Sequence, residues 1–207
     1  MALATVIRSF APPANNPTGL TFDGRALWIG DEITDLIYQV DPGTTTVIRS
    51  FAARTSQLSG LTFDGRYLWV CARDSDLIYQ MDPETGTVIR SFAAPVNWPV
   101  GLAFDGRSLW NVDLETMLIY QIDPETGTVI RSFAAPGTQP RGITWDGRTL
   151  WHVDSAKHRI HQIDPETGTV IRVVASPDTS PWPITFDGRT LFIGDYSTHL
   201  IYQVDIG

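Results

Sequence analysis

The chain consists of a 41-residue unit that recurs until the sequence ends. The turn dipeptide Asp-Gly begins in the five copies at Asp23, Asp64, Asp105, Asp146 and Asp187. A second aspartate follows an apolar run such as LIYQV and stands at Asp41, Asp82, Asp123, Asp164 and Asp205. A repeated unit of this length must bury its faces against its neighbours, so the repeat is the strongest constraint on the fold.

Each unit contains four short apolar segments separated by turn signals, and none has the sustained 3.6-residue period of a helix. In the first copy the predicted strands are 19–22, 26–29, 36–40 and 46–51. Asp23-Gly24 predicts a two-residue hairpin turn between the first two strands. The sequence DPETGT predicts a second hairpin, and its left-handed residue is expected at Gly86, Gly127 and Gly168.

Four-stranded units of about 40 residues are typical of β-propellers. We therefore predict an all-β, five-bladed β-propeller in which residues 1–207 form a single domain with four antiparallel strands per 41-residue blade. The predicted blades are 11–51, 52–92, 93–133, 134–174 and 175–207 plus 3–10.

The two ends of the chain predict how the ring closes. The sequence begins within a fourth strand, 5–10, and ends after a third strand, 200–204. The last blade is therefore completed by the N-terminal strand, which removes two open sheet edges. Five units of 41 residues occupy 205 residues, which leaves Met1 and Ala2 over.

Aromatic residues recur at two positions of the unit and are predicted to pack between blades. Large aromatic side chains dominate core energetics, and 43% of the chain is hydrophobic. The two sets are Phe22, Phe63, Phe104, Trp145 and Phe186 on the first strand, and Trp28, Trp69, Trp110, Trp151 and Phe192 on the second. We assign both sets to the core and give them no role in binding.

The charge of the chain restricts its partners. The formal net charge is -8 and the 15 basic residues form no run, which argues against binding to nucleic acid or to an anionic membrane surface. No apolar run approaches the length of about 18 residues that a membrane span needs, and the start MALATVIRSF lacks the pattern of a signal peptide. The single cysteine, Cys71, is expected to be a buried and unreactive thiol, compatible with any redox compartment.

The loops fall into a constant set and a varied set. The DGR and DPETGT turns barely differ among the copies and are expected together on one face, the constant face. The connections between blades and those between second and third strands differ in every copy and are expected on the opposite, variable face. Varied loops on a rigid scaffold commonly carry recognition, although unconstrained loops also drift, so we expect the site on the variable face.

Two adjacent copies carry unusual residues directly before the first strand. This position reads Thr18, Ser59, Val100, Arg141 and Trp182. An arginine beside an aromatic residue near the axis is suited to hold a carboxylate, a phosphate or a sugar, and the alternative is an ion pair between Arg141 and a neighbouring aspartate. Trp98, in the interblade loop AAPVNWPV, joins Arg141 and Trp182 as a candidate ligand-binding residue.

Polar residues replace an aliphatic residue of the second strand in two copies. Asn111 and His152 stand where Ile29 and Val70 stand in earlier copies. We take Asn111 and His152 as candidate pocket residues, against the alternative of a buried histidine bonded to backbone.

An aspartate follows the second strand in four copies, at Asp31, Asp113, Asp154 and Asp195. Carboxylates repeated around a ring are a candidate site for a cation such as calcium. Equivalent residues of adjacent blades are expected to lie too far apart to share one ion, so capping of the following loop is favoured. No metal site and no cofactor is predicted.

The units, for example GLTFDGRYLWVCARDSDLIYQMDPETGTVIRSF, resemble repeats of bacterial β-propellers in the superfamily of quinoprotein-like propellers and five-bladed glutaminyl cyclases. The resemblance covers the whole chain and rests on the scaffold motifs GLTFDGxxLW and LIYQxDPETG. It implies the propeller fold and, for the cyclases, an acidic residue near the axis that transfers protons. The position before the first strand holds no glutamate in any copy, which departs from that pattern. The similarity of the copies is typical of a recently amplified or consensus-like propeller.

Three hypotheses for function follow. The favoured one is a non-enzymatic binding or scaffold module that recognises a small polar ligand, a glycan or a protein segment, because no copy pairs a base with a nucleophile. The second is a lyase or cyclotransferase at the mouth of the axis, with His152 as general base, Arg141 as anion holder and Asp154 or Asn111 as orienting residue. The third is assembly: a monomer is expected, but its N-terminal strand can instead pair with the last blade of a neighbouring copy.

Overall fold

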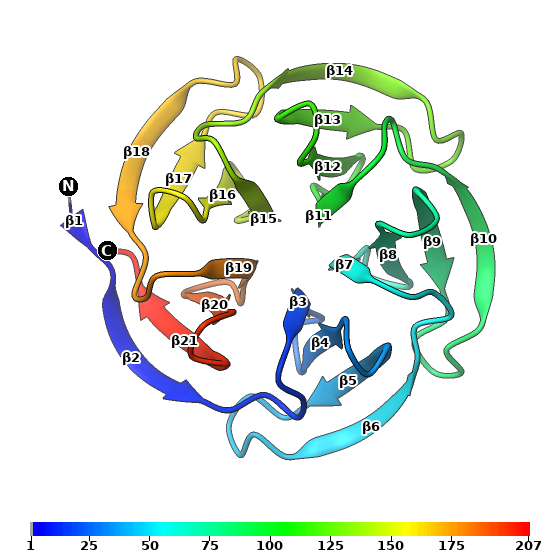
Figure 1. Cartoon of the computed structure of the whole chain (residues 1–207), viewed down its shortest axis with the longest axis horizontal. Helices are drawn as coiled ribbons and strands as arrows, with labels where there is room; N and C mark the ends of the chain where they lie inside the picture. Colours follow the sequence, from blue (N-terminus) through cyan, green and yellow to red (C-terminus); the bar gives the residue numbers. More distant parts are fainter. Residues whose placement is uncertain (1) are drawn as a thin grey trace.

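The computed structural model describes residues 2–207 as a closed ring of five antiparallel β-sheets around a central axis (Figure 1). One strand of each sheet lines the axis: β3 (Pro17–Phe22), β7 (Leu58–Phe63), β11 (Pro99–Phe104), β15 (Pro140–Trp145) and β19 (Pro181–Phe186). The second strands are β4 (Leu27–Asp31), β8 (Leu68–Ala72), β12 (Leu109–Asp113), β16 (Leu150–Asp154) and β20 (Leu191–Asp195). The predicted all-β, five-bladed propeller is confirmed.

The outer half of each blade contains the remaining strands. The third strands are β5 (Leu36–Val40), β9 (Leu77–Met81), β13 (Leu118–Ile122), β17 (Arg159–Ile163) and β21 (Leu200–Asp205). The rim is formed by β6 (Val47–Ala52), β10 (Val88–Ala93), β14 (Val129–Ala134), β18 (Val170–Ala175) and β2 (Thr5–Phe10). None of the described residues, 2–207, belongs to a helix that could span a bilayer.

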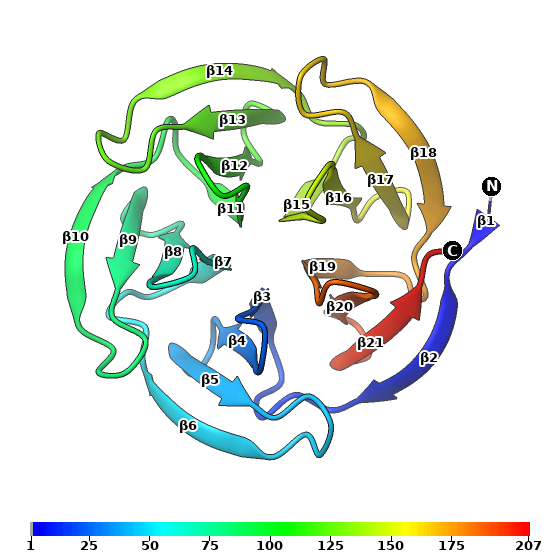
Figure 2. The same cartoon turned by 180° about the vertical axis from the view of Figure 1, so that it is seen from behind.

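The ring closes through the N-terminal strand, as the sequence predicts. β2 pairs antiparallel with β21, with Thr5 opposite Asp205 and Phe10 opposite Ile201. The two ends of the described chain lie close together at the rim, where the fourth and fifth blades meet (Figure 2). A two-residue strand, β1 (Ala2–Leu3), adds to the edge of β18 in parallel, so Ala2 is paired with Val174 rather than left over. Met1 lies outside the described residues.

The tryptophans of the second strands pack between blades, as predicted. Trp28 is 1% exposed and lies in a cluster with Leu61, Leu68 and Val70 of the next blade. Its indole Nε1 donates a hydrogen bond to Asp23 Oδ2 at 2.7 Å. The same bond is made by Trp69, Trp110 and Trp151 to Asp64, Asp105 and Asp146. In these four blades the aspartate of the Asp-Gly pair therefore satisfies the one polar group of the buried ring.

The first hairpin turn lies one residue later than predicted. The backbone N–H of Asp23 donates to Ala26 O at 3.1 Å, so the two-residue loop is Gly24-Arg25. Gly24 has a φ of 91°, and a positive φ at the first loop residue only is the pattern of a type II′ turn. Asp23 remains in extended backbone because its Oδ1 accepts the N–H groups of Arg25 and Ala26, at 2.8 and 2.6 Å.

The second hairpin turn follows the prediction in the copies that contain DPETGT. Gly86, Gly127 and Gly168 have φ values of 68°, 73° and 71°. Asp82 Oδ1 accepts the N–H groups of Glu84 and Thr85, and these bonds lower the pKa of Asp82. In the first copy, DPGTT, Thr45 takes the same left-handed conformation with a φ of 62°.

Candidate functional site

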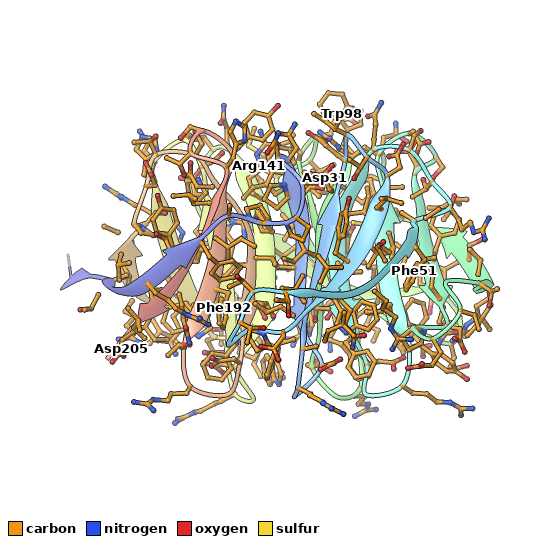
Figure 3. The ribbon with its side chains drawn as sticks, turned by 90° about the horizontal axis from the view of Figure 1, so that it is seen from below. Asp31, Phe51, Trp98, Arg141, Phe192 and Asp205 are labelled. Carbon is orange, nitrogen blue, oxygen red and sulfur yellow. The ribbon has the colours of Figure 1, made fainter. Side chains whose placement is uncertain are left out.

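The two kinds of loop lie on opposite faces of the disc. Viewed from the edge, Asp31, Trp98 and Arg141 lie near one face, whereas Asp205 lies at the other (Figure 3). In each blade the interblade loop and the loop after the second strand are joined by one backbone hydrogen bond, for example Glu32 N to Asn16 O at 3.3 Å. The five bonded pairs are Glu32 with Asn16, Arg73 with Gln57, Leu114 with Trp98, Ser155 with Gln139, and Tyr196 with Ser180.

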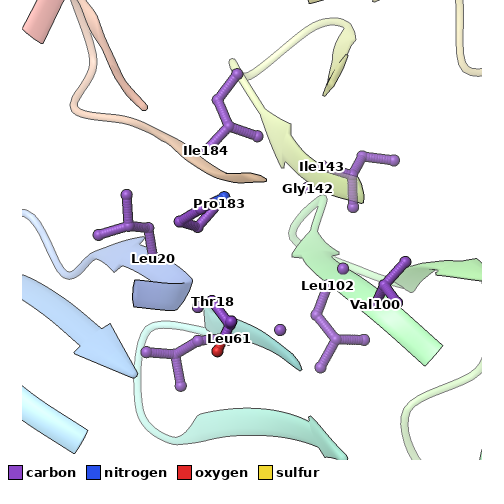
Figure 4. A pocket seen from close by; sticks show the side chains of 12 residues that line it. Thr18, Leu20, Leu61, Val100, Leu102, Gly142, Ile143, Pro183 and Ile184 are labelled. Carbon is purple, nitrogen blue, oxygen red and sulfur yellow. The ribbon is translucent and has the colours of Figure 1, made fainter. Parts of the chain in front are cut away.

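Below this face the axis is closed by the inner strands. The space left between them has a volume of about 10 Å³, close to the minimum for one water molecule (Figure 4). Glycines allow this close approach: a Cβ on Gly142 would lie 2.3 Å from Trp182 O, and one on Gly101 would lie 2.5 Å from Arg141 O. A ligand therefore meets a closed floor rather than a channel.

The opening above this floor, which we call the axial mouth, is formed by two positions of the repeat. The first is the position before the inner strand, predicted from the sequence: Thr18, Ser59, Val100, Arg141 and Trp182. The second is the position after the second strand: Glu32, Arg73, Leu114, Ser155 and Tyr196. Thr18, Ser59 and Val100 are 0–1% exposed, so the accessible side chains of the mouth are those of Arg141 and of the second position.

Arg141 stacks on Trp182, as the sequence suggests. The guanidinium Cζ lies 4.0 Å from the centroid of the Trp182 ring, and Nε donates to Ser155 Oγ at 3.4 Å. The predicted alternative, an ion pair with a neighbouring aspartate, is not found: the ion pairs among residues 2–207 do not include Arg141. Burial and the neighbouring Arg73 lower the pKa of Arg141. Its half-buried positive charge is thus left without a carboxylate partner.

A buried ion pair lies on the other side of the mouth. Arg73 pairs with Glu32, and their side chains are only 17% and 15% exposed. The Arg73 Cζ also lies 5.2 Å from the Trp182 ring centroid, so two guanidiniums contact one indole. Burial raises the pKa of Glu32 above its usual range, although the charge of Arg73 opposes that shift. Glu32 is thus an acidic residue whose charge interacts with both Arg73 and Arg141.

A pocket of about 380 Å³ opens beside Arg141 and Trp182, between the fourth and fifth blades. Its walls include Gln139, Ser155 and Tyr196, and the Tyr196 ring lies 6.0 Å from that of Trp182. Trp182 is 8% exposed, and its Nε1 is buried without a hydrogen-bond partner. The pocket therefore combines a cation without an ion-pair partner, two neighbouring aromatic rings and hydroxyl groups.

His152 and Asn111 do not line this pocket. Both are fully buried, and each contacts the inner strand of its own blade: His152 Nδ1 is 3.1 Å from Gly142 O, and Asn111 Nδ2 donates to Gly101 O at 3.0 Å. His152 also stacks on His161 at 6.2 Å. Burial and His161 lower the pKa of His152 to about 3. The structure thus places the His152 and Asn111 side chains in the interior of their blades, outside the pocket that Arg141 lines.

The aspartates after the second strands are used as caps, as favoured from the sequence. Asp31 accepts the N–H of Thr34 at 2.8 Å and that of Asn16 in the interblade loop at 2.6 Å. Asp195 bonds the equivalent N–H groups, and Asp113 bonds Thr116 N at 2.7 Å. Asp154 differs, because it bonds only the interblade loop, through Gln139 N. Among residues 2–207, no three His, Cys, Asp or Glu side chains are placed to hold a metal ion.

Sequence reasoning missed Glu32, Arg73, Ser155 and Tyr196. The signal was present, because these residues follow the capping position Asp31, Ala72, Asp154 and Asp195 and differ in every copy. What the sequence did not show is that the backbone bond to the interblade loop brings this position to the mouth.

Comparison with known structures agrees with this architecture. The chain superposes on glutaminyl cyclase from Myxococcus xanthus with a TM-score of 0.81 and 14% identity, over 98% of this chain and 95% of that one. It also superposes on a streptogramin B lyase, with a TM-score of 0.59 and 20% identity over 96% and 67% of the two chains. It superposes on a WD40 propeller domain of Doa1 with a TM-score of 0.62 and 16% identity, over 91% of this chain and 63% of that one. No family model and no curated sequence matches. The likeness establishes a five-bladed propeller similar in structure to the cyclase and the lyase, and these identities carry the fold alone.

Proposed function

We propose that the protein is a binding module that holds the carboxylate of a small polar ligand at the axial mouth. The observation that carries this proposal is the half-buried guanidinium of Arg141, which has no acidic partner among the described residues. A partly desolvated cation is costly unless it is paired, and a carboxylate is the natural two-pronged partner of a guanidinium. The carboxylate of Glu32, whose charge acts on Arg141 from a distance, is itself paired with Arg73.

The remainder of the site supports a small ligand rather than a long one. The pocket volume of about 380 Å³ lies in the range of small-molecule sites, and the closed floor prevents threading along the axis. Tyr196, with 41% of its surface exposed, offers a ring face to the ligand, and Ser155 offers a hydroxyl. The largely buried Trp182 ring packs against the Arg141 guanidinium, with Cζ 4.0 Å from its centroid, and holds that group in place. Together they fit a ligand with a carboxylate and a further polar or flat group.

Thermal shift and calorimetry with N-acetyl amino acids, each compared with its neutral amide, test the proposal. The acids are expected to raise the melting temperature and the amides to have little effect, because binding to the native state stabilises it. Arg141→Thr installs the residue that the first blade carries at this position, Thr18, and should weaken acid binding roughly 10- to 100-fold. Arg107→Ala, on the constant face, is the matched control. Equal binding by wild type and Arg141→Thr, or no binding of any acid, would contradict the proposal.

Glu32 favours a second candidate, acid–base catalysis at the same mouth. Its carboxyl is largely buried and pairs with Arg73, which contacts the pocket-lining Trp182, and burial raises its pKa, the direction that acid–base catalysis requires of a carboxyl group. Two solved structures of this fold are enzymes, a glutaminyl cyclase and a streptogramin B lyase. This candidate replaces His152 and Asp154 by Glu32 as the proton-transfer group and keeps Arg141 as the anion holder.

Mass spectrometry separates the two candidates. A peptide that begins with glutamine, and streptogramin B, are incubated with the protein and with Glu32→Gln. Loss of ammonia from the peptide or opening of the antibiotic, abolished by Glu32→Gln, would support catalysis. If both compounds stay unchanged while N-acetyl amino acids still bind, the binding module stands and this cyclase or lyase chemistry is rejected.

A further inference from the structure

A second hollow on the variable face lies over the third blade and contains the exposed Trp98. The chain has seven tryptophans, and Trp98 alone is exposed, with 53% of its surface accessible, whereas Trp28 is 1% and Trp182 8% exposed. Within residues 2–207 its ring makes neither an aromatic pair nor a cation–π contact, unlike Trp182. Figure 3 shows Trp98 at the upper edge of the disc, clear of the blades.

The backbone of Trp98 is held firmly although its side chain is free. Its φ is 68°, a left-handed conformation that costs a large side chain free energy. Its N–H donates to Asp76 Oδ1 at 3.1 Å, and its carbonyl accepts Leu114 N at 3.2 Å. Gln57 has the equivalent place in the second blade, with a φ of 53°. The point from which the indole projects is therefore fixed by the backbone, and the ring is left accessible.

The hollow beside the Trp98 ring carries polar groups that the protein itself does not use. Its volume is about 430 Å³, and it is lined by Asn97, Trp98, Leu114 and Glu115. Asn97 and Glu115 are exposed, and within residues 2–207 neither side chain takes part in an ion pair or a hydrogen bond. The hollow thus presents an amide donor, amide and carboxylate acceptors, and one aromatic face.

We infer that this hollow is a carbohydrate-binding site that takes a neutral pyranose. A pyranose has an apolar C–H face that stacks on an indole and a rim of hydroxyls, which both donate and accept hydrogen bonds. Trp98 and Leu114 offer apolar surface to the C–H face of the sugar. Asn97 and Glu115 offer hydrogen-bonding groups to its hydroxyls. A quaternary ammonium would call for several aromatic walls, and only one is present. The site lies apart from the pocket of Arg141, and its existence does not depend on the function proposed for that pocket.

The test uses methyl β-glucopyranoside, cellobiose, lactose and N,N′-diacetylchitobiose, with choline as the cationic probe. Saturation-transfer NMR and titrated tryptophan fluorescence report binding by the full chain. At least one sugar is expected to bind, with magnetisation transferred to its ring C–H protons. Trp98→Gln should weaken that binding roughly tenfold or more. This variant carries the residue that the second blade holds in the same backbone conformation, so it should fold as wild type does.

Further variants and outcomes separate the alternatives. Glu115→Gln, which keeps a hydrogen-bonding side chain, should weaken sugar binding several-fold, whereas Arg141→Thr should leave it unchanged. Binding of sugar that is equal in wild type and Trp98→Gln overturns the inference, as does the absence of binding by every sugar. Choline binding that depends on Trp98 and Glu115 would make the hollow a cation site and also overturns it. Loss of sugar binding in Arg141→Thr would place the sugar in the axial mouth and likewise rejects the inference.

Discussion

The two faces of the disc use their polar side chains in opposite ways. On the constant face, Asp64 accepts two backbone N–H groups, at 2.8 and 2.6 Å, and Trp69 Nε1 at 2.7 Å. On the variable face, Arg141 has only a long contact with Ser155, and Trp182 Nε1 is buried without a partner. Side chains of the constant face thus complete the hydrogen bonding of the fold, whereas the Arg141 guanidinium at the axial mouth keeps bonding capacity for a ligand.

This difference separates the two tasks of the chain. The turns that recur in every copy connect strands and satisfy buried groups, so a change there is expected to cost stability. The loops that differ are held mainly by backbone bonds and by capping aspartates, so their other side chains are free to vary. The comparison predicts that substitutions on the constant face cause large losses of stability. Substitutions on the variable face are expected to cause small losses, or even gains, of stability.

The largest effect is expected where the constant face is interrupted. The last blade lacks a continuous DPETGT turn, and its rim strand β2 comes from the start of the chain. Deleting residues 1–10 exposes the edge of β21 and removes the contact of Phe10 with Phe192, whose rings lie 6.4 Å apart. We expect loss of cooperative unfolding and aggregation, measured by circular dichroism and light scattering.

Two controls accompany this deletion. Removing residues 1–4 takes away only β1 and should leave a monomer of nearly full stability. A soluble, equally stable chain after deletion of residues 1–10 would overturn the closure. A full-length chain with a mass that rises with concentration above 22.9 kDa would favour the strand-swapped assembly instead.

The next effect concerns a single aspartate of the constant face. Asp64→Ala removes three hydrogen bonds at once and leaves the buried Nε1 of Trp69 without a partner. Hydrogen bonds to a charged group and an unsatisfied buried donor predict a loss of about 3 kcal/mol in the free energy of unfolding. Urea titration measures it. Arg66→Ala, in the same turn, should change stability by less than about 0.5 kcal/mol, and equal effects of the two variants would refute this role of Asp64.

The sequence predicted the fold well because the same turn residues and apolar segments recur in all five copies. Three features were sufficient to predict five blades and their closure by residues 5–10: the period, the turn residues, and the division of one blade between the two ends of the chain. The position of Arg141 beside Trp182 also follows from the sequence, since adjacent blades bring equivalent positions together. Glu32 and Arg73 did not follow, because their approach to the mouth depends on the path of an irregular loop, which apolar periodicity does not encode.

His152 lies on neither face, because its polar ring is fully buried in the interior. Its burial predicts that the stability of the protein depends on pH. Burial and His161 hold the pKa of His152 at about 3, below the ordinary value of about 6.5. As the pH falls below about 6.5, His152 becomes protonated in the unfolded chain but stays neutral in the folded chain. The free energy of unfolding therefore falls by up to about 1.4 kcal/mol per pH unit. The stability that the neutral, buried His152 contributes is fully present above pH 6.5 and is lost as the pH falls toward 3.

His152→Val, which installs the residue that the second blade carries as Val70, should remove that part of the pH dependence. Between pH 7 and pH 5.5 we expect wild type to lose about 1 kcal/mol more than the variant, measured by urea titration at both pH values. Arg107→Ala, on the constant face, removes no group that titrates between pH 7 and pH 5.5; it is the control and should leave the slope unchanged. Identical slopes for wild type and His152→Val would refute the assignment.

The smallest predicted effect has the opposite sign and lies on the variable face. Met117 has a φ of 57° and is 43% exposed. Two earlier copies place Asp35 and Asp76 at the same position with φ values of 52° and 53°, and aspartate and asparagine tolerate this conformation better than methionine does. Met117→Asn keeps the carbonyl that accepts Ala135 N at 2.9 Å and should raise stability by about 0.5–1 kcal/mol. Met117→Ala, which removes the same side chain without favouring a left-handed backbone, should bring no gain. A loss of stability in Met117→Asn would mean that the methionine side chain, and not its backbone, determines the free energy at this position, and that the variable face is less tolerant than its hydrogen bonding indicates.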